Sequence, residues 1–282
     1  MKARLTLLAF ALSCAAAPAG AFDFSNIGKL LETVTKVKDA TTEITEPQEI
    51  ELGEGVASNL LGAAPLLKKP ALQQYVNQVG LWLALQTERP DLPWRFGVLD
   101  DANINAFATP GGNIFITNGL LQRMSNEAEL AGVLAHEIAH VLKKHHLEAI
   151  KKSARTGLFT DVAVLAVDRK GHNPAIAKLA GAGTELYARG LDKDDEFEAD
   201  RMGVVIAARA GYDPFGLPAM LQILQGIEPG NSDLALMFKT HPTPSDRLGL
   251  LESLMSNGFE GFDARPNLAA RFKAVNGPVK KP

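Results

Sequence analysis

Two histidines and a glutamate stand in the order His136-Glu137-x-x-His140, a spacing that suits the binding of a metal ion. On a helix the two histidines lie about 40° apart around the axis and about 6 Å apart along it, so both imidazoles can reach one ion. Glu137 lies beside them and can serve as a general base. This arrangement is typical of zinc hydrolases, in which the metal acidifies water and the carboxylate takes a proton. The alternative is a pair of polar residues on a half-buried helix face.

A catalytic zinc site needs a third protein ligand, and the acidic run Asp-Lys-Asp-Asp-Glu-Phe-Glu-Ala-Asp offers one. Helical spacing puts Glu196 and Asp200 on one face of this run, whereas Glu198 lies about 160° from Glu196. We therefore predict one zinc ion per chain, bound by His136, His140 and Glu196. Asp200 is expected to accept a hydrogen bond from the distal nitrogen of a ligating histidine. The alternative is that these acids only complement the dipole of a helix N-terminus.

The remaining histidines that follow the motif are not predicted to be ligands. If the helix continued, His145 would point about 180° away from His136, and His146 would lie about 15 Å farther along the axis. Both are therefore expected to be solvated, and His172 is expected in a loop.

Helical periodicity dominates the chain, which predicts a mainly α-helical α+β fold with one active-site helix. That helix is expected over 126–150, with Asn126 as its N-cap and Glu129 completing a capping box. Pro70 suits the first turn of an earlier helix. Further helices are expected at 26–40, 174–190, 193–210, 214–226 and 243–256.

A period of two replaces the helical pattern between residues 94 and 117. It predicts a small three-stranded antiparallel sheet that ends in a hairpin around Pro110 and Gly111. The last strand is predicted to be an edge strand whose backbone pairs with an extended peptide. Its residues for this role are Asn113, Ile114, Phe115 and Ile116. A role as a core strand is the alternative.

The composition is that of a globular protein, with 282 residues, 46% of them hydrophobic, and a formal net charge of −3. This charge gives no reason to expect nucleic acid as a partner. The first 21 residues indicate an export signal, with an apolar core over 5–12 and cleavage after Ala21. That core is shorter than the roughly 20 residues that a membrane anchor needs. The mature chain would then begin at Phe22 without a transmembrane span, because its most apolar stretch, Leu158 to Val167, is short and contains Thr160 and Asp161. The alternative is lipidation of Cys14.

Further motifs accompany the histidine pair. They are Asn105-Ala106-Phe107-Ala108, Pro110-Gly111-Gly112, Gly119-Leu120-Leu121, the run from Glu129 to Glu137, Glu196-x-x-x-Asp200, His241-Pro242 and Arg247. In these motifs the chain resembles the gluzincin metallopeptidases typified by HtpX and the CAAX prenyl protease, and is nearest to their soluble periplasmic members of the BepA and LoiP type. The resemblance implies a zincin-like fold, zinc ligands at His136, His140 and Glu196, and a general base at Glu137.

The resemblance also implies that His241 lies near the open coordination position of the zinc ion. There it could stabilise an oxyanion as a donor or cover the position as an inhibitory lid. A third reading is that His241 is a capping or structural histidine ahead of the helix expected at 243–256. Arg247 is expected to be structural and to orient this loop behind the ligands.

These observations predict a periplasmic zinc endopeptidase whose substrates and partners are unfolded or damaged envelope proteins, with Glu137 as the general base. The alternatives are a zinc-dependent chaperone or assembly module with little proteolysis, and a hydrolase of cell-wall peptide. The oligomeric state is left open. The expected divisions are a signal peptide at 1–21, a helical arm and linker at 22–69, the peptidase domain at 70–260 and a tail at 261–282.

Overall fold

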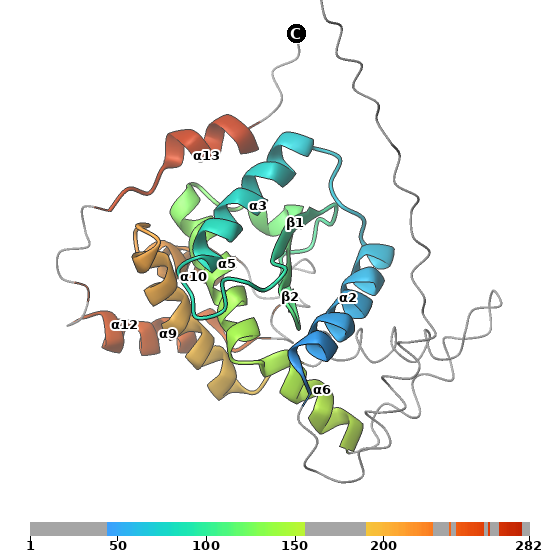
Figure 1. Ribbon diagram of the computed structural model, residues 1–282. Helices are drawn as coiled ribbons and strands as arrows, with labels where there is room; N and C mark the ends of the chain where they lie inside the picture. The colour runs from blue at the N-terminus through green and yellow to red at the C-terminus, as the bar shows by residue number, and fades with distance from the viewer. Residues whose placement is uncertain are drawn as a thin grey trace, which may run out of the picture.

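The computed structural model describes residues 44–155, 190–227, 237, 241–256, 259 and 265–277. In these residues a mainly helical fold surrounds a small sheet (Figure 1). The elements are α2 (Glu46–Ala63), α3 (Pro70–Ala84), β1 (Arg95–Leu99), β2 (Ala106–Thr109), β3 (Asn113–Thr117), α4 (Asn118–Leu121), α5 (Glu127–Leu142), α6 (His145–Arg155), α9 (Lys193–Arg209), α10 (Gly216–Gln225), α12 (Pro244–Met255) and α13 (Ala269–Asn276).

Most of the predicted helices that fall on described residues are present. α3 begins at Pro70, and α9, α10 and α12 match the predicted helices after residue 190 to within two residues at each end. The helix predicted at 26–40, the helix predicted at 174–190 except for its last residue, the signal segment 1–21 and His172 lie outside the described residues. None of the described helices combines the length and the apolar character needed to cross a membrane.

The sheet is mixed, so the prediction of an antiparallel sheet is wrong. β3 is the central strand and pairs in parallel with β1 and antiparallel with β2. The alternation of side chains reveals which residues face the core, but it does not reveal which strands become neighbours.

The central position of β3 overturns the prediction that it is an edge strand for peptide binding. Both hydrogen-bonding sides of β3 are already paired, and all five of its residues are buried. The side chains of Asn113, Ile114, Phe115 and Ile116 therefore belong to the interior, as the core-strand alternative held. The edges of the described sheet are β1, which an isolated bridge from Leu66 covers at Leu99, and β2.

The active-site helix α5 is buried along its whole length. It begins as predicted, because the Asn126 side chain accepts a hydrogen bond from the Glu129 backbone N–H at 3.0 Å. The Glu129 carboxylate in turn accepts from the Ser125 backbone N–H at 2.6 Å. The predicted continuation to residue 150 is wrong, since α5 ends at Leu142 and Lys144 adopts a left-handed conformation with φ of 58°.

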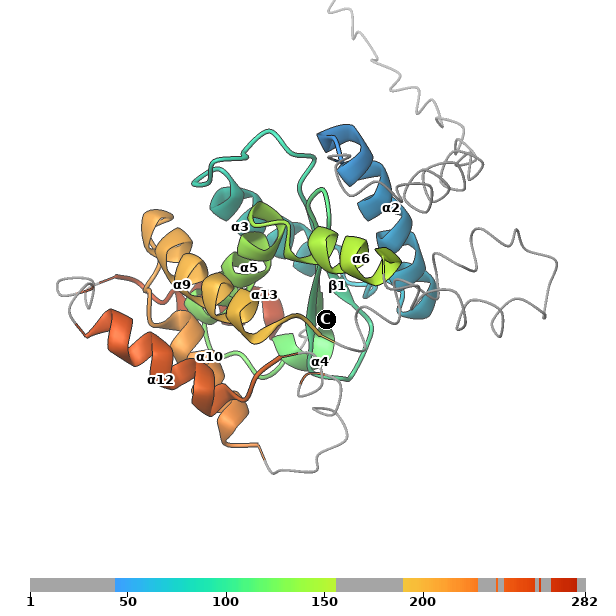
Figure 2. The same cartoon turned by 90° about the horizontal axis from the view of Figure 1, so that it is seen from below.

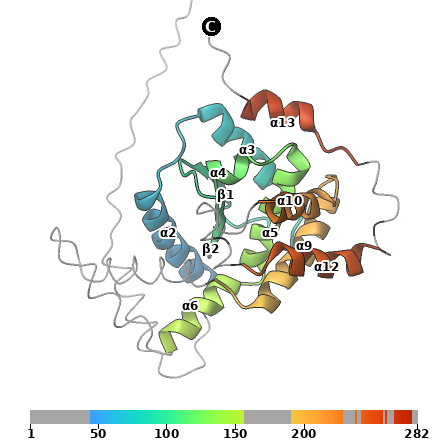
Figure 3. The same ribbon diagram turned by 180° about the vertical axis from the view of Figure 1, so that it is seen from behind.

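α5 packs closely against α9, and the two helices lie side by side in Figures 1 and 3. Gly203 of α9 lies against the backbone of His136. A Cβ atom at this position would lie 2.9 Å from the backbone nitrogen of His136, closer than real Cβ contacts allow. The absence of a side chain at Gly203 therefore lets the two backbones touch at the level of the motif.

Two helices near the ends of the described chain complete the fold, and Figure 2 shows α2 beside the sheet. α2 packs on the sheet through Val56 and Ala57, which contact a cluster that includes Phe107 and Phe115. α13, in the segment predicted as a tail, packs on α3 and α5 and buries Phe272. Both helices are thus part of the packed structure.

Candidate metal centre

The three predicted zinc ligands meet between α5 and α9. His136 Nε2 lies 3.1 Å from His140 Nε2 and 3.5 Å from Glu196 Oε2, and His140 Nε2 lies 3.6 Å from Glu196 Oε1. Donor atoms bound to a tetrahedral zinc ion at about 2.0–2.1 Å are about 3.4 Å from one another. The three donors therefore have the chemistry and spacing that zinc requires.

The Glu196 carboxylate is buried and has one oxygen without a hydrogen-bond partner among the described residues. Its side chain is 0% exposed, and among the described residues Oε1 has no hydrogen-bond partner. Burial would raise the pKa of Glu196, but His241 and His140, with hydrogen bonds from His136 and His241, hold it well below its ordinary value. A buried carboxylate that stays ionised with an unsatisfied oxygen fits a metal ion in the remaining space.

Asp200 and Arg247 lie directly behind His136. Asp200 Oδ1 is 3.0 Å from His136 Nδ1, so Nε2 of this ring is left for the metal. Arg247 donates from Nε to Asp200 Oδ2 at 2.8 Å and from Nη2 to Oδ1 at 2.5 Å. Although burial opposes ionisation, the charge and hydrogen bonds of Arg247 lower the pKa of Asp200 to about 2. The pair thus presents a charged acceptor that fixes the orientation of the His136 ring.

Glu137 is buried beside the ligands and shares a pocket with His140, Glu196 and His241. Burial raises the pKa of its carboxyl group, and the nearby charges of His136 and His241 oppose this only in part. A raised pKa makes the carboxylate a stronger base than an exposed glutamate. The position and basicity of Glu137 therefore suit proton transfer.

His241 enters the centre from the loop before α12. Its Nδ1 lies 2.6 Å from Glu196 Oε2, and His136, Glu196 and His241 each offer a donor atom within 4.8 Å of the other two. The capping alternative is wrong, because Thr243 is the N-cap of α12 and accepts a hydrogen bond from the Asp246 backbone N–H. The donor and lid readings of His241 both remain compatible with this position.

The expectation that His145 and His146 are solvated is wrong. They are 6% and 9% exposed, because the chain turns at Lys144 and brings them back against the end of α5. His140 Nδ1 lies 2.9 Å from His145 Nδ1. No glycine or asparagine marks this turn, so local sequence gave no signal for it.

Glu198, which the spacing places away from the ligands, pairs instead with Lys143 and His145. Its carboxylate oxygens lie 2.7 Å from Lys143 Nζ and 3.2 Å from His145 Nε2. A hydrogen-bonded series thus runs from His140 through His145 to Glu198.

Asn105, which belongs to one of the motifs but was not predicted to be a site residue, is a further polar residue of the pocket. It is 1% exposed, and among the described residues its Nδ2 has no hydrogen-bond partner. Ala106 and Phe107 of the edge strand β2 line the same pocket. An unsatisfied donor and an edge strand therefore lie together beside the metal centre.

Comparisons with known proteins agree with this geometry. Residues 70–255 match peptidase family M48. The beta-barrel assembly-enhancing protease of Escherichia coli (strain K12) is 34% identical over 206 residues, which cover 71% of this chain and 42% of that protein. The mitochondrial metalloendopeptidase OMA1 of Schizosaccharomyces pombe is 31% identical over 180 residues, or 63% of this chain and 51% of that protein.

A protease HtpX homolog of Ralstonia nicotianae is 32% identical over 207 residues, which cover 60% of this chain and 71% of that protein. The aligned part spans less than half of the E. coli relative, at 42% of its length. The family match includes α5 and α9, which carry the proposed ligands, and it also includes His241. The chain therefore belongs to peptidase family M48, the metalloendopeptidase family that its motifs indicate.

Proposed function

We propose that the protein is a zinc-dependent endopeptidase that hydrolyses peptide bonds in unfolded or damaged envelope proteins. The observation that carries this proposal is the convergence of His136, His140 and Glu196 at distances of 3.1–3.6 Å, with one Glu196 oxygen unsatisfied among the described residues. When bound there, zinc would polarise water and the carbonyl of the substrate.

Glu137 supplies the proton transfers of the reaction. Its buried carboxylate takes a proton from the attacking water and passes that proton to the leaving amine. Asp200 and Arg247 keep the His136 ring oriented throughout, because their hydrogen bonds fix its Nδ1. His241 donates a hydrogen bond to the oxygen that gains negative charge in the transition state.

β2 replaces β3 as the element that we propose contacts a bound peptide. Its residues Ala106 and Phe107 line the pocket that contains Glu137, and Asn105 Nδ2 offers an unsatisfied donor next to them. The name of the E. coli relative, beta-barrel assembly-enhancing protease, favours envelope proteins as the substrate class.

The proposed location is the periplasm, reached by an export signal that is removed after Ala21. Intact-mass analysis of protein from the periplasmic fraction of a Gram-negative cell tests this, and a chain that begins at Phe22 is expected. A diacyl or triacyl adduct on Cys14 would instead establish the lipoprotein alternative.

The activity is tested with zinc-loaded mature protein and unfolded casein. The wild type should cleave casein, and Glu137→Gln should retain zinc but lose cleavage. A protein that suppresses aggregation of casein without cutting it would support the chaperone alternative. Cleavage confined to cell-wall peptides would support the alternative that the protein hydrolyses cell-wall peptide. Mass spectrometry of envelope proteins that co-purify with Glu137→Gln would then identify the physiological substrates.

A further inference from the structure

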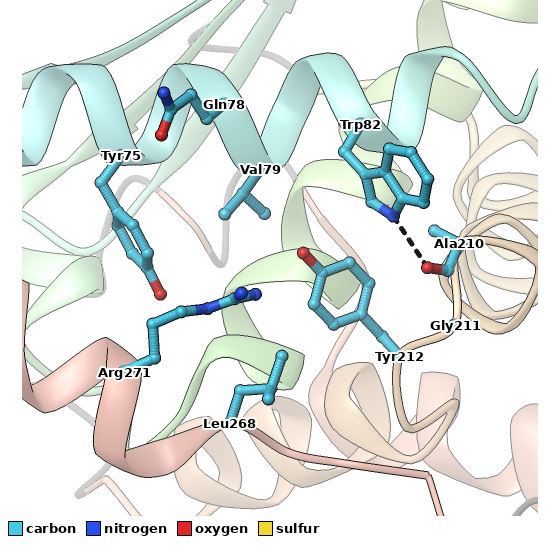
Figure 4. A pocket seen from close by; sticks show the side chains of 9 residues that line it. All are labelled: Tyr75, Gln78, Val79, Trp82, Ala210, Gly211, Tyr212, Leu268 and Arg271. Carbon is cyan, nitrogen blue, oxygen red and sulfur yellow. Dashed lines mark hydrogen bonds between the residues drawn. The ribbon is translucent and has the colours of Figure 1, made fainter.

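A second pocket lies at the far ends of the two helices that carry the metal ligands (Figure 4). It has a volume of about 340 Å³, and its lining includes Ala210 at the end of α9 and Arg271, which bonds to Glu127 at the start of α5. His140 and Glu196 occupy the opposite ends of the same helices. The pocket is therefore separate from the metal centre, and its volume falls in the range of small-ligand sites.

Three of the lining side chains, those of Tyr75, Tyr212 and Arg271, converge on one buried carboxylate. Glu127 is 0% exposed and accepts hydrogen bonds from the hydroxyls of Tyr75 at 2.5 Å and Tyr212 at 2.8 Å. Arg271 donates to it from Nε at 2.5 Å and also from Nη2. These bonds hold the guanidinium group of Arg271 in one orientation between the two tyrosine rings, as Figure 4 shows.

One nitrogen of Arg271 is left for a ligand. Among the described residues Nη1 has no hydrogen-bond partner, and the side chain is 56% exposed. A guanidinium group has two edges that can each bind a carboxylate, and here only one edge is used. Because Glu127 already fixes the group, a second carboxylate binds without the entropy cost of ordering a free arginine.

Apolar and aromatic side chains surround this free edge. Trp82 is 50% exposed, and its indole N–H donates to the Ala210 carbonyl at 2.8 Å, which holds the ring at the rim. Val79 and Leu268 supply aliphatic surface, and Tyr212 supplies a second ring. The pocket therefore combines an anchored cation with an apolar surface.

We propose that this pocket binds the C-terminal residue of a polypeptide whose last side chain is apolar. The terminal carboxylate meets the free edge of Arg271, and the side chain packs against Trp82 and Tyr212. The choice of a polypeptide over another carboxylate rests on the proposed function, since unfolded protein substrates present such chain ends.

Binding is tested on the Glu137→Gln chain, so that the probe is not cut. The probes are acetyl-Ala-Ala-Phe with a free carboxylate and the same tripeptide with a C-terminal amide. The chain has two tryptophans, and Trp94 is only 6% exposed, so a change in fluorescence on binding reports on Trp82. The free acid should bind about 10- to 100-fold more tightly than the amide, as expected for a charge-assisted hydrogen bond. Equal binding of the two probes, or no binding of either at millimolar concentration, would overturn the proposal.

Arg271→Lys isolates the free edge. A lysine keeps the positive charge beside Glu127 but has no planar fork, so the preference for the free acid should fall to less than threefold. Arg95→Lys is the matched control, because Arg95 pairs with Glu54 on the surface and should leave the preference unchanged. An undiminished preference in Arg271→Lys would refute the proposed contact.

A second variant covers the case in which Arg271→Lys does not fold. Trp82→Ala removes an exposed ring, and calorimetry should show at least a fivefold weaker affinity for the free acid. Unchanged affinity would rule out the apolar surface as part of the site. Casein cleavage by wild-type protein is measured separately, so failure of this site and failure of the proposed peptidase activity are distinguishable.

Discussion

His140 Nδ1 lies 2.9 Å from His145 Nδ1, so one of the two rings donates a proton and the other accepts it. His140 can bind a metal ion through Nε2 only when Nδ1 carries the proton, which makes His140 the donor. His145 then keeps its own proton on Nε2, which lies 3.2 Å from a Glu198 oxygen. Only one direction of this hydrogen-bonded series is thus compatible with metal binding.

The role of His145 leads to the first prediction. His145→Ala leaves His140 Nδ1 without its acceptor, so zinc affinity should fall about 10- to 100-fold. Competition with a chelator of known affinity measures the change. His145→Gln should recover part of the affinity, since its amide oxygen can accept from His140.

Lys143→Ala is the control for this experiment. Lys143 contacts Glu198 at 2.7 Å but touches no ligand, so its removal should leave zinc affinity unchanged. Wild-type affinity in His145→Ala would contradict the prediction.

The choice of the third ligand leads to the second prediction. Glu196→Ala should lose zinc, because it removes one of three buried donors, whereas Glu198→Ala should still bind one ion per chain. His136→Ala should abolish binding. Elemental analysis of the purified variants measures the zinc content. Full retention of zinc by Glu196→Ala together with its loss in Glu198→Ala would show that the wrong glutamate has been assigned.

The third prediction concerns removal of the metal. The core of α3, α5, α9, α10 and the sheet is apolar and continuous without any contribution from an ion. A chelator should therefore stop peptide hydrolysis while the far-ultraviolet circular dichroism spectrum stays nearly unchanged. Collapse of the helical signal would instead make the metal structural.

The fourth prediction separates the two readings of His241. We expect His241→Ala to keep zinc and to lower kcat about 10²- to 10³-fold with a smaller change in KM, because an oxyanion donor acts mainly in the transition state. Peptidase assays on protein of measured zinc content test this. A rise in kcat would establish the lid, and an unchanged kcat would eliminate both roles.

The fifth prediction concerns the buried Glu127. Burial raises its pKa, but the hydrogen bonds from Arg271, Tyr75 and Tyr212 outweigh this and lower it below the ordinary value. A lowered pKa in the folded state gives a stabilisation that is complete above the unfolded value of about 4.3 and is lost as the pH falls through the folded value. Glu127→Gln should therefore reduce the free energy of unfolding by about 2 kcal/mol at pH 7.

Urea unfolding at a series of pH values checks this dependence. The difference between wild type and Glu127→Gln should stay constant from pH 7 to about pH 5 and shrink below about pH 4. Glu54→Gln, which breaks an exposed pair with Arg95, should cost less than about 1 kcal/mol. A difference that grows as the pH falls would show that folding raises the pKa of Glu127 instead of lowering it.

Local spacing was sufficient to predict which side chains converge in the candidate site. The turn of a helix fixes the relation of His136 to His140 and of Glu196 to Asp200, and the Asn126 cap fixes where α5 begins. These features depend on residues no more than four positions apart. They can therefore be derived from the chain without knowledge of its neighbours.

The errors arose where distant segments decide the outcome. The pairing of β3 with both β1 and β2 depends on how the strands assemble, and alternation along each strand is the same for either order. The reversal at Lys144 has no glycine to mark it, so His145 could not be placed against His140 from spacing alone. The segment of α13 was predicted to be a tail, because Phe272 becomes buried only when α3 and α5 pack against it.

The contact between Gly203 and His136 also bears on which ions the centre accepts. The two helices cannot move closer, since their backbones already touch, and moving apart would open a void in a close-packed interior. Glu196 lies on the same helix as Gly203, about two turns before it. The distance between Glu196 and His136 can therefore neither shorten nor lengthen easily. An ion such as calcium, whose bonds are about 2.3–2.6 Å long, would need wider spacing and more oxygen ligands than this frame provides. The contact between the two backbones thus fixes a ligand spacing that favours a small ion.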